Sequence, residues 1–574
     1  MIDKGVAIRY GDVAVGAKEN FVPTSSEKQF DTLNQLLEYN SIFPNYANPC
    51  ELYQTLLDGN RKPLPKDTNE ANLGLWSVQT SGLSGFFYPD ITLTLTAEGQ
   101  YTSQGFTITF DVENNIYCTS MTITWYRNGN QIETAGFAPN SPFYFCSKKV
   151  ENFDKVVFTF KKLNMPQNRL KVHAIDFGYG TIFYGNELRS VKVIQELNPI
   201  SSEITINTTD FTLDSKTDID YSFQTKQQLS TYFNGKLIST TFIKSAKRKS
   251  KNIWEVQTED YIGSMDSTTF VGGIYENANA VDLLETIFNV AGVMYDISES
   301  FNTATVSGYI PYTTCREALM QVAFAIQAVV DTSNSDKVKV FALGNTITQT
   351  VPLNRIMQGQ SFTDEETVTS VEVAYHKYIP TSETMDAYSA ESDGTGNNIQ
   401  VIFSEPLHGL TITNGSIVTS ATNYAVINAS ENCVLTGKKY NHSMQYKTKN
   451  NPVVLASDTQ NVVAIENATL VSNSNVDNVL QKCYNYLIKT NTTNLKIVDG
   501  KHEVLGAQIK YGSEKYGTFY YGGREESQIT YDVPVNVGDC ISAETEYLGN
   551  VSGNVIKETY TLNGNTIVKD AELK

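Results

Sequence analysis

Neighbouring acidic residues are the side chains in this sequence with the clearest potential for chemistry. They occur as Glu259-Asp260, as Asp364-Glu365-Glu366 and as Glu525-Glu526. Two carboxylates that flank a glycosidic bond are the machinery of glycoside hydrolases. A chain with 62 Asp and Glu residues also contains adjacent acids as solvated or salt-bridged surface groups, and we favour this second interpretation.

The histidines show no metal-binding or catalytic spacing. There are five, at positions 173, 376, 408, 442 and 502, and none belongs to an H-E-x-x-H sequence. The G-x-S-x-G elbow of hydrolases and the glycine-rich phosphate-binding fingerprints are absent too. We therefore predict a protein that is not an enzyme, with no catalytic residue, no metal ligand and no cofactor.

A basic run is the densest charge feature of an otherwise acidic chain. It consists of Lys244, Lys247, Arg248, Lys249 and Lys251. One interpretation is a solvated hairpin loop. The other is a subunit interface that meets acidic surfaces of a neighbour, where paired charges set register and specificity.

Aromatic residues between positions 90 and 180 are candidates for stacking on a sugar. Trp125 shares one strand face with Met121 and Ile123, so we expect it in the core rather than on a sugar-binding platform. The candidates for a glycan-facing side chain are Tyr101, Tyr126, Phe137 and Tyr144.

The basic run is positioned by a predicted β-meander over residues 226–266. Asn234-Gly235 joins the runs QLSTYF and KLISTTFI, and such a pair favours a two-residue hairpin turn. A third strand, residues 252–258, follows the basic loop 244–251, with Trp254 and Val256 on one face.

Helical spacing appears in four places. An amphipathic helix is predicted over 27–39, and a second begins near residue 280 and ends at Gly292. A third starts after Thr313 or Thr314, and a fourth covers 476–489 with Ser474 as its cap. Between the helices, period-two alternation predicts many strands.

Composition restricts the partners. The formal net charge of −18 argues against nucleic acid, which needs a basic footprint. The first residues do not read as a secretory signal, and no apolar run is long enough to span a membrane. Folding in a cytosol and reduced, mostly buried cysteines are the expectation for the seven Cys residues.

Two family resemblances follow from these patterns. The strands GFTITFD, TITWYRNG, FYF, FDKVVFTFKK and RLKVHAIDFG resemble the discoidin-like sandwich of carbohydrate-binding modules. The stretch from NPISSEITINTTDFTL through Asp260, together with Val537-Gly538-Asp539 and the hairpin Leu562-Asn563-Gly564-Asn565, resembles phage baseplate-hub and tail-tip proteins.

These resemblances imply a mainly β protein with an α/β insertion, a jelly-roll-like sandwich and two tail-tube-like β-barrels. The expected domains are an adaptor segment (1–89), the sandwich (90–180), the first barrel (181–278), a small α/β domain (279–361) and a β-rich region ending in the second barrel (362–574).

The implied function is that of a structural component of a phage tail tip or baseplate. It would be the hub that caps the tail tube, located in the virion tail and assembled in the host bacterial cytoplasm. The implied partners are two further copies in a trimer and other tail proteins, such as tube, distal-tail, fibre or spike proteins. The alternatives are a tail-anchored protein that binds cell-surface glycan for host attachment, and a tail-associated glycan hydrolase.

Overall fold

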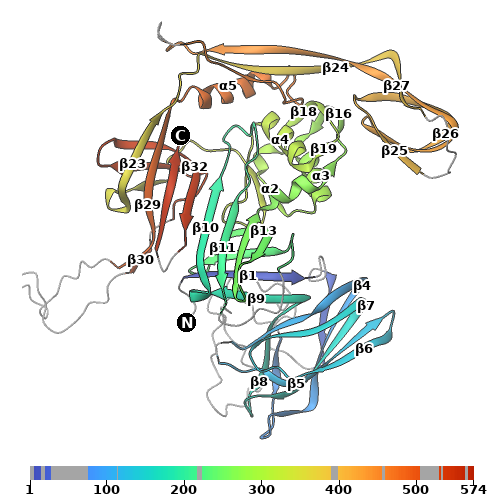
Figure 1. The fold of residues 1–574 in the computed structure, drawn as a ribbon, viewed down its shortest axis with the longest axis vertical. Helices are drawn as coiled ribbons and strands as arrows, with labels where there is room; N and C mark the ends of the chain where they lie inside the picture. The colour runs from blue at the N-terminus through green and yellow to red at the C-terminus, as the bar shows by residue number, and fades with distance from the viewer. Residues whose placement is uncertain are drawn as a thin grey trace, which may run out of the picture. The chain divides into compact units, whose positions relative to one another are not determined.

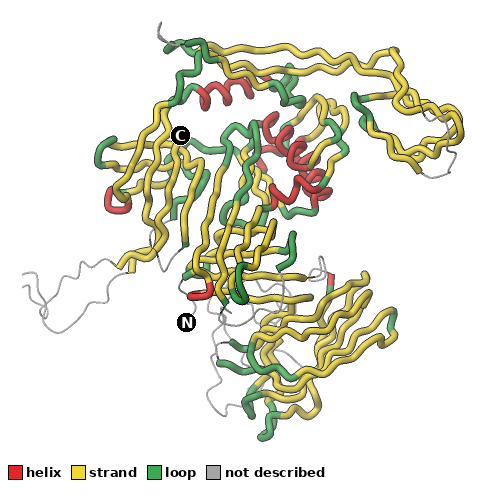
Figure 2. The backbone as a smooth tube through the Cα atoms, viewed as in Figure 1, coloured by secondary structure: helices red, strands yellow, loops and turns green. Residues whose placement is uncertain are grey.

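A computed structural model describes most of the chain, in two compact units. The described residues are 5–13, 20–26, 75–112, 114–215, 223–389, 398–454, 459–503, 529–531, 534–562 and 566–574. Unit 1 comprises residues 1–187 and 219–236, and unit 2 comprises residues 188–218 and 237–574. The predicted helix 27–39 and the Asn563-Gly564 turn lie outside the described residues. The chain is mainly β, as predicted (Figures 1 and 2).

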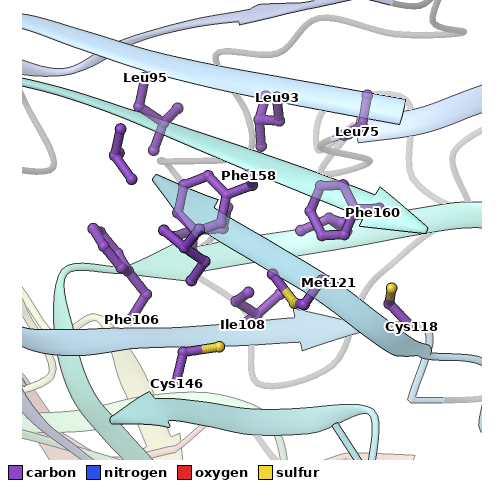
Figure 3. Close-up of a cluster of buried hydrophobic side chains, with 14 of the residues drawn as sticks. Leu75, Leu93, Leu95, Phe106, Ile108, Cys118, Met121, Cys146, Phe158 and Phe160 are labelled. Atoms are coloured by element: carbon purple, nitrogen blue, oxygen red, sulfur yellow. The ribbon is translucent and has the colours of Figure 1, made fainter. Parts of the chain in front are cut away.

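Unit 1 is built around a seven-stranded antiparallel sheet in the order β3-β8-β4-β7-β5-β6, with β2 beside β4. Its strands are β2 (Val22–Ser25), β3 (Leu75–Thr80), β4 (Phe86–Phe110), β5 (Cys118–Arg127), β6 (Asn130–Phe137), β7 (Phe143–Leu163) and β8 (Arg169–Asp176). Alternate residues of the long strands β4 and β7 enclose an aromatic-rich core (Figure 3). This agrees with the period-two pattern, whereas the likeness to carbohydrate-binding modules stays a prediction.

Strand β5 shows how that pattern works. Met121, Ile123 and Trp125 are all buried, as expected for one strand face. The ring of Trp125 stacks on Phe106, with 6.0 Å between the ring centroids. Asn128 and Gly129 both have positive φ and form the turn into β6. The prediction of Trp125 as a core residue is confirmed.

A smaller set of strands completes unit 1. β1 (Val6–Val13) pairs antiparallel with both β9 (Gly178–Tyr184) and β12 (Gln228–Phe233). Arg9 on β1 donates hydrogen bonds of 2.9 and 2.8 Å to the two carboxylate oxygens of Asp176. Both bonds come from one guanidinium nitrogen, Nη2, and this ion pair ties β1 to the end of β8.

Unit 2 contains one long antiparallel sheet, drawn from two distant parts of the chain. Its order is β23-β29-β33-β32-β10-β11-β14-β13. The strands are β10 (Leu188–Glu196), β11 (Thr208–Asp214), β13 (Lys236–Arg248), β14 (Ile253–Glu259), β23 (Ile356–Asp364), β29 (Asn491–Glu503), β32 (Gly549–Thr561) and β33 (Thr566–Leu573). Two side ladders add β30 (Ile529–Tyr531) on β29, and β22 (Gln349–Val351) on β31 (Cys540–Thr545), which pairs with β32.

The Asn234-Gly235 turn is present. Asn234 has φ 48° and Gly235 has φ 78°, as a two-residue hairpin turn requires. The following strand is longer than predicted, because β13 continues to Arg248 and pairs with β14 up to Trp254. Most of the predicted basic loop is therefore strand.

Three helices and short strands form the α/β part. The elements are α2 (Tyr261–Ser264), β15 (Thr269–Phe270), β16 (Gly273–Asn279), α3 (Ala280–Ala291), β17 (Tyr295–Ile297), β18 (Thr305–Ile310), β19 (Thr313–Thr314), α4 (Cys315–Ile326), β20 (Val329–Asp331) and β21 (Val338–Phe341). Gly292, with φ 68°, ends α3 as predicted. Of the two possible caps of α4, the structure uses Thr314, whose hydroxyl accepts from the Glu317 N–H.

In the sequence, a long ribbon separates β23 from β29, and Figure 1 shows it at the top of the view. Its elements are β24 (Ser370–Ser389), β25 (Asn398–Ile402), β26 (Leu407–Ser420), β27 (Tyr424–Asn450) and β28 (Val462–Ile465). β24 and β27 pair over most of their length, and the far end has its own apolar cluster around Leu407, Ile427 and Leu435. Asn423 connects this end of the ribbon to the α/β part, because its side-chain amide donates hydrogen bonds to the carbonyls of Val271 and Ile310.

Helix α5 (Val476–Leu487) follows the ribbon. Its predicted cap is wrong. The N-cap is Asn475, which makes no capping bond, because its Oδ1 accepts from the Ser472 N–H, while its Nδ2 donates to the Ala325 and Leu470 carbonyls. Ser474 contacts the Ser472 hydroxyl at 2.8 Å. Further on, Gly538, with φ 91°, forms the predicted Val537-Gly538-Asp539 turn.

Candidate assembly surfaces

The described residues contain no group of three or more His, Cys, Asp or Glu side chains placed to hold a metal ion. Nor does that part of the chain contain a helix long and apolar enough to cross a membrane. All six cysteines it includes are buried and free. None of the acidic pairs in the described residues belongs to such a group, and Glu525-Glu526 lies outside the described residues.

Asp260 is a buried structural acid. Its carboxylate accepts from the backbone N–H of Gly263 and of Asn207, each at 3.0 Å, and from the Thr332 hydroxyl at 2.5 Å. Burial raises the pKa of Asp260 to about 6, although these hydrogen bonds lower it. The neighbouring Glu259 forms an ion pair with Lys244 instead, at 3.3 Å. The two carboxyl groups therefore have different structural roles in this pair.

Two histidines meet on the ribbon, which the sequence spacing did not reveal. Nδ1 of His376 on β24 lies 2.9 Å from Nε2 of His442 on β27. His376 Nε2 is 3.1 Å from the Glu466 carbonyl oxygen, and Tyr378 stacks on His442. Burial, and then the positive charge that His442 can carry, lower the pKa of His376. A carbonyl oxygen can only accept, so Nε2 of His376 is the donor to Glu466. This hydrogen bond therefore selects the tautomer of His376.

A charged cluster lies inside the long sheet. Lys569 Nζ is 3.0 Å from Glu558 Oε2 and 3.2 Å from Asp499 Oδ2, and Arg355 also binds Asp499. Burial raises the pKa of Glu558 to about 7, whereas its two acidic partners raise the pKa of Lys569 despite burial. We take Lys569 and Arg355 as charged, since each contacts a carboxylate directly. The cluster joins β29, β32 and β33 internally.

The five basic residues are spread along the end of the β13–β14 hairpin. Lys244, Lys247, Arg248, Lys249 and Lys251 are all exposed. Lys249 pairs with Glu255 at 2.9 Å, and the Arg248 guanidinium lies 5.4 Å from the centre of the Trp254 ring. Glu255 and Glu259 thus offset part of the charge. The structure places all five at the end of one hairpin, but its surface is not uniformly basic.

None of the four aromatic candidates is a freely exposed platform. Tyr101, Phe137 and Tyr144 are partly buried against the core of unit 1. Tyr126 is half-buried, with Lys155 Nζ 5.1 Å from its ring centre. An aromatic residue that the sequence did not single out, Tyr88 at the start of β4, is 77% exposed.

The long sheet of unit 2 is an internal repeat. The first four-strand group has the order β10-β11-β14-β13, and the second has the order β23-β29-β33-β32. In both groups the chain forms the first, second, fourth and third strands in turn. The first strands are nine residues long and the fourth strands are thirteen. A short strand precedes the fourth strand in each group, β12 in one and β31 in the other.

The two repeats meet edge to edge within the chain. β10 pairs antiparallel with the second half of β32, from Lys192↔Thr561 to Glu196↔Lys557. A 2.7 Å ion pair between Lys557 and Glu196 closes one end of this junction. The fourth strand of the second repeat, β32, therefore has a backbone edge that pairs with the first strand of the first repeat, β10.

Side chains on the two faces of this sheet differ. Buried residues alternate with exposed or half-buried ones along β11 and β14. On the exposed face, charges of opposite sign pair across strands, as in Lys496–Asp570 at 4.0 Å and Lys557–Glu196. Such a face is polar and charge-balanced, so it is suited to water rather than to an apolar partner.

No protein-family model matches the sequence, and no curated protein matches it in a sequence search. Solved structures do resemble the fold. The 43 kDa tail protein of prophage MuSo2 from Shewanella oneidensis has 8% identity and a TM-score of 0.38, covering 68% of this chain and 94% of its own. A tail protein from Neisseria meningitidis has 11% identity and a TM-score of 0.38, covering 67% and 92%.

A third similar structure is a component of the type VI secretion system from E. coli. It has 7% identity and a TM-score of 0.30, and the match covers 67% of this chain and 73% of that one. At these identities and scores, none of the three likenesses carries an argument about function.

Proposed function

We propose that this protein is a structural component of a phage tail tip or baseplate, or of a related tail-like particle. It would be the hub that caps the tail tube as a trimer and contacts other tail proteins. The residues that carry this role are those of strand edges and polar faces. Catalysis has no part in it.

The observation that supports this most is the repeat in unit 2. Two groups of strands with the same order share one sheet and join through the pairing of β10 with β32. An interface between unlike surfaces, repeated by rotation, generates a closed ring. Three copies with two repeats each would present six similar units, which is the number needed to match a sixfold tube.

The polar face of the sheet fits a surface that stays wet within such a ring. Its cross-strand ion pairs satisfy the charges of Lys496, Asp570, Lys557 and Glu196 within the sheet. The resemblance of the sequence to baseplate-hub proteins points to the same role.

Labelling tests the proposal. An antibody or gold label directed at this chain should decorate purified tail particles at the tip of the tube, one cluster per particle. Decoration along the whole tube, or its absence from particles in cells that make the protein, would contradict the role.

A second candidate function, glycan binding, is favoured by one feature of unit 1. Leu83, in the loop before β4, is 82% exposed, and Tyr88, at the start of β4, is 77% exposed. An exposed aromatic ring is the usual platform for the apolar face of a sugar. Binding of the full chain on a glycan array, with loss of binding in Tyr88→Ala, would support this candidate, and an unchanged array pattern would contradict it.

A further inference from the structure

Three side chains of the charged cluster in unit 2 are in direct contact. Lys569 on β33 has its Nζ 3.2 Å from Asp499 Oδ2 on β29 and 3.0 Å from Glu558 Oε2 on β32. The three strands are neighbours in the order β29-β33-β32, so the lysine lies between the two acids. Formation of an amide needs an amine nucleophile, a carboxyl carbon and a group that moves protons, and this cluster contains all three.

The register of the sheet fixes this arrangement. Lys569 is paired with Ile497 on one side and with Tyr560 on the other. Asp499 is two residues beyond Ile497, and Glu558 is two residues before Tyr560. Residues two apart on a strand share a face, and diagonal neighbours are within reach of a long side chain. The backbone therefore places both acids diagonal to the lysine, on the buried face of the sheet.

Water is excluded from the cluster. The side chains of Lys569 and Asp499 are 4% and 3% exposed, and that of Glu558 is 0% exposed. The ring centre of Tyr560 lies 5.2 Å from Lys569 Nζ. Burial of two opposite charges carries a large desolvation penalty, and burial of a neutral amide carries a smaller one. Burial therefore favours the product in which an amide replaces the two charges and a water molecule is released.

Both oxygens of Asp499 accept from donors in addition to Lys569. Arg355 forms an ion pair with Oδ1, and the backbone N–H of Val535 donates to Oδ2 at 3.1 Å. Such donors stabilise the negative charge that develops on a carboxyl group when an amine adds to its carbon. Because Oδ1 is held by the guanidinium, it is the oxygen that stays on the carbon as the amide oxygen.

Glu558 is placed to move the protons. Its Oε2 accepts from the Lys569 amine, whereas its Oε1 is buried and has no hydrogen-bond partner among the described residues. Burial raises the pKa of this acid to about 7, so both its forms are populated near neutral pH. A general acid and base works best when its pKa is near the pH of the reaction, and Glu558 meets this condition.

We propose that Lys569 and Asp499 form an intramolecular amide bond, with Glu558 as the catalytic residue. The Glu558 carboxylate takes one proton from the Lys569 ammonium, and the freed amine attacks Asp499 Cγ to form the C–N bond. The bond from Cγ to Oδ2 breaks, and Oδ2 leaves as water with the two protons that the nitrogen loses, one of them returned by Glu558. The third N–H stays on the amide nitrogen, where it keeps its hydrogen bond to the Val535 carbonyl.

The cross-link would join β29 to β33 covalently. It would close a loop between residues 499 and 569 and prevent the two strands from separating under force or in denaturant. The inference goes beyond the proposed function, because the chemistry of the cluster is the same whether or not the chain belongs to a tail.

The mass of the intact full chain under denaturing, reducing conditions tests the proposal. The wild type should be lighter than its sequence requires by the mass of one water molecule, and Glu558→Gln and Lys569→Arg should lack this deficit. Trypsin cuts after lysine and arginine. In the wild type, peptides 497–501 and 558–574 should therefore be recovered as one joined species in which Lys569 is uncut.

Lys339 provides a matched control. Its Nζ lies 2.6 Å from Asp331 Oδ2, closer than in the pair of Lys569 with Asp499, but its side chain is 34% exposed. Water reaches this lysine and keeps it a solvated ammonium ion, so Lys339→Arg should retain the mass deficit of the wild type. A deficit that maps to Asp331 would contradict the requirement for a buried cluster.

The wild-type measurements need no variant to fold, so they decide the main point. Full mass after folding and prolonged incubation would overturn the cross-link. So would a loss of water confined to Asp499-Gly500 without joined peptides, because an aspartate before a glycine can also lose water by closing a ring with the next backbone nitrogen. A deficit that persists in Glu558→Gln would overturn the catalytic role of Glu558.

Discussion

At the scale of single residues, the buried charges set how stability responds to pH. Glu558 has an ordinary pKa of 4.5 and one of about 7 in the folded chain, because burial disfavours its ionised form. The folded state therefore holds this proton more tightly than the unfolded state does. The stabilisation is complete below pH 4.5 and is lost as the pH rises through 7.

This predicts a slope that Glu558→Gln removes. The free energy of unfolding of unit 2 should fall between pH 5 and pH 8 by on the order of 1–3 kcal/mol in the wild type, and stay flatter in Glu558→Gln. Denaturant unfolding at a series of pH values measures it. The same slope in both proteins would show that Glu558 does not titrate in this window.

Asp260 provides a second residue-scale prediction. Asp260→Ala removes the acceptor of two backbone N–H groups and of the Thr332 hydroxyl, and it leaves those donors buried. The expected loss of stability is about 2–4 kcal/mol by chemical denaturation. Asp282→Ala, at an exposed position in the first turn of α3, is the matched control and should change stability by less than about 0.5 kcal/mol.

At this scale, the sequence could not reveal contacts between residues that are far apart along the chain. His376 and His442 are paired because β24 and β27 are, and no local spacing encodes that pairing. Lys569, Glu558 and Asp499 likewise read as ordinary surface charges on three alternating strands. By contrast, Trp125 was predictable, because the period-two pattern of β5 decides its face.

At the scale of elements, the two faces of β5 predict losses of stability of different size on substitution. Trp125→Ala opens a cavity beside Phe106 and should destabilise unit 1 by about 3–5 kcal/mol. Tyr126→Ala, the next residue on the other face, should cost less than about 1 kcal/mol. Thermal unfolding of the full chain compares them, and equal losses would mean that the core of unit 1 is not where β5 puts it.

Helix ends and turns that depend on residues close together in the sequence were predicted correctly. Gly292 ends α3, Thr314 caps α4, and Asn234-Gly235 turns the chain before β13. Ser474 was wrong because tertiary contacts of Asn475 override the local capping preference. The end of β13 was missed because its lysines suggested a loop, whereas pairing with Glu255 and Glu259 lets charged residues continue the strand.

The repeat itself was only partly foreseen. Two barrel-like regions followed from the resemblance, but the shared sheet and the equivalence of β23 with β10 did not. The reason is physical. β23 is separated from β29 by the ribbon and α5, so the second repeat is interrupted in sequence although it is continuous in space.

At the scale of the whole molecule, the two strand groups that the pairing of β10 with β32 joins within one chain predict the symmetry of the assembled protein. The central claim is that three copies of this chain, each with two similar strand groups, form a ring that caps the tail tube. Determining the symmetry of the assembled chain by electron cryomicroscopy tests it most directly. The account predicts three copies with threefold symmetry, in which each chain contributes two strand groups joined by the pairing of β10 with β32. Six copies in a sixfold ring, or a chain that stays monomeric, would contradict it.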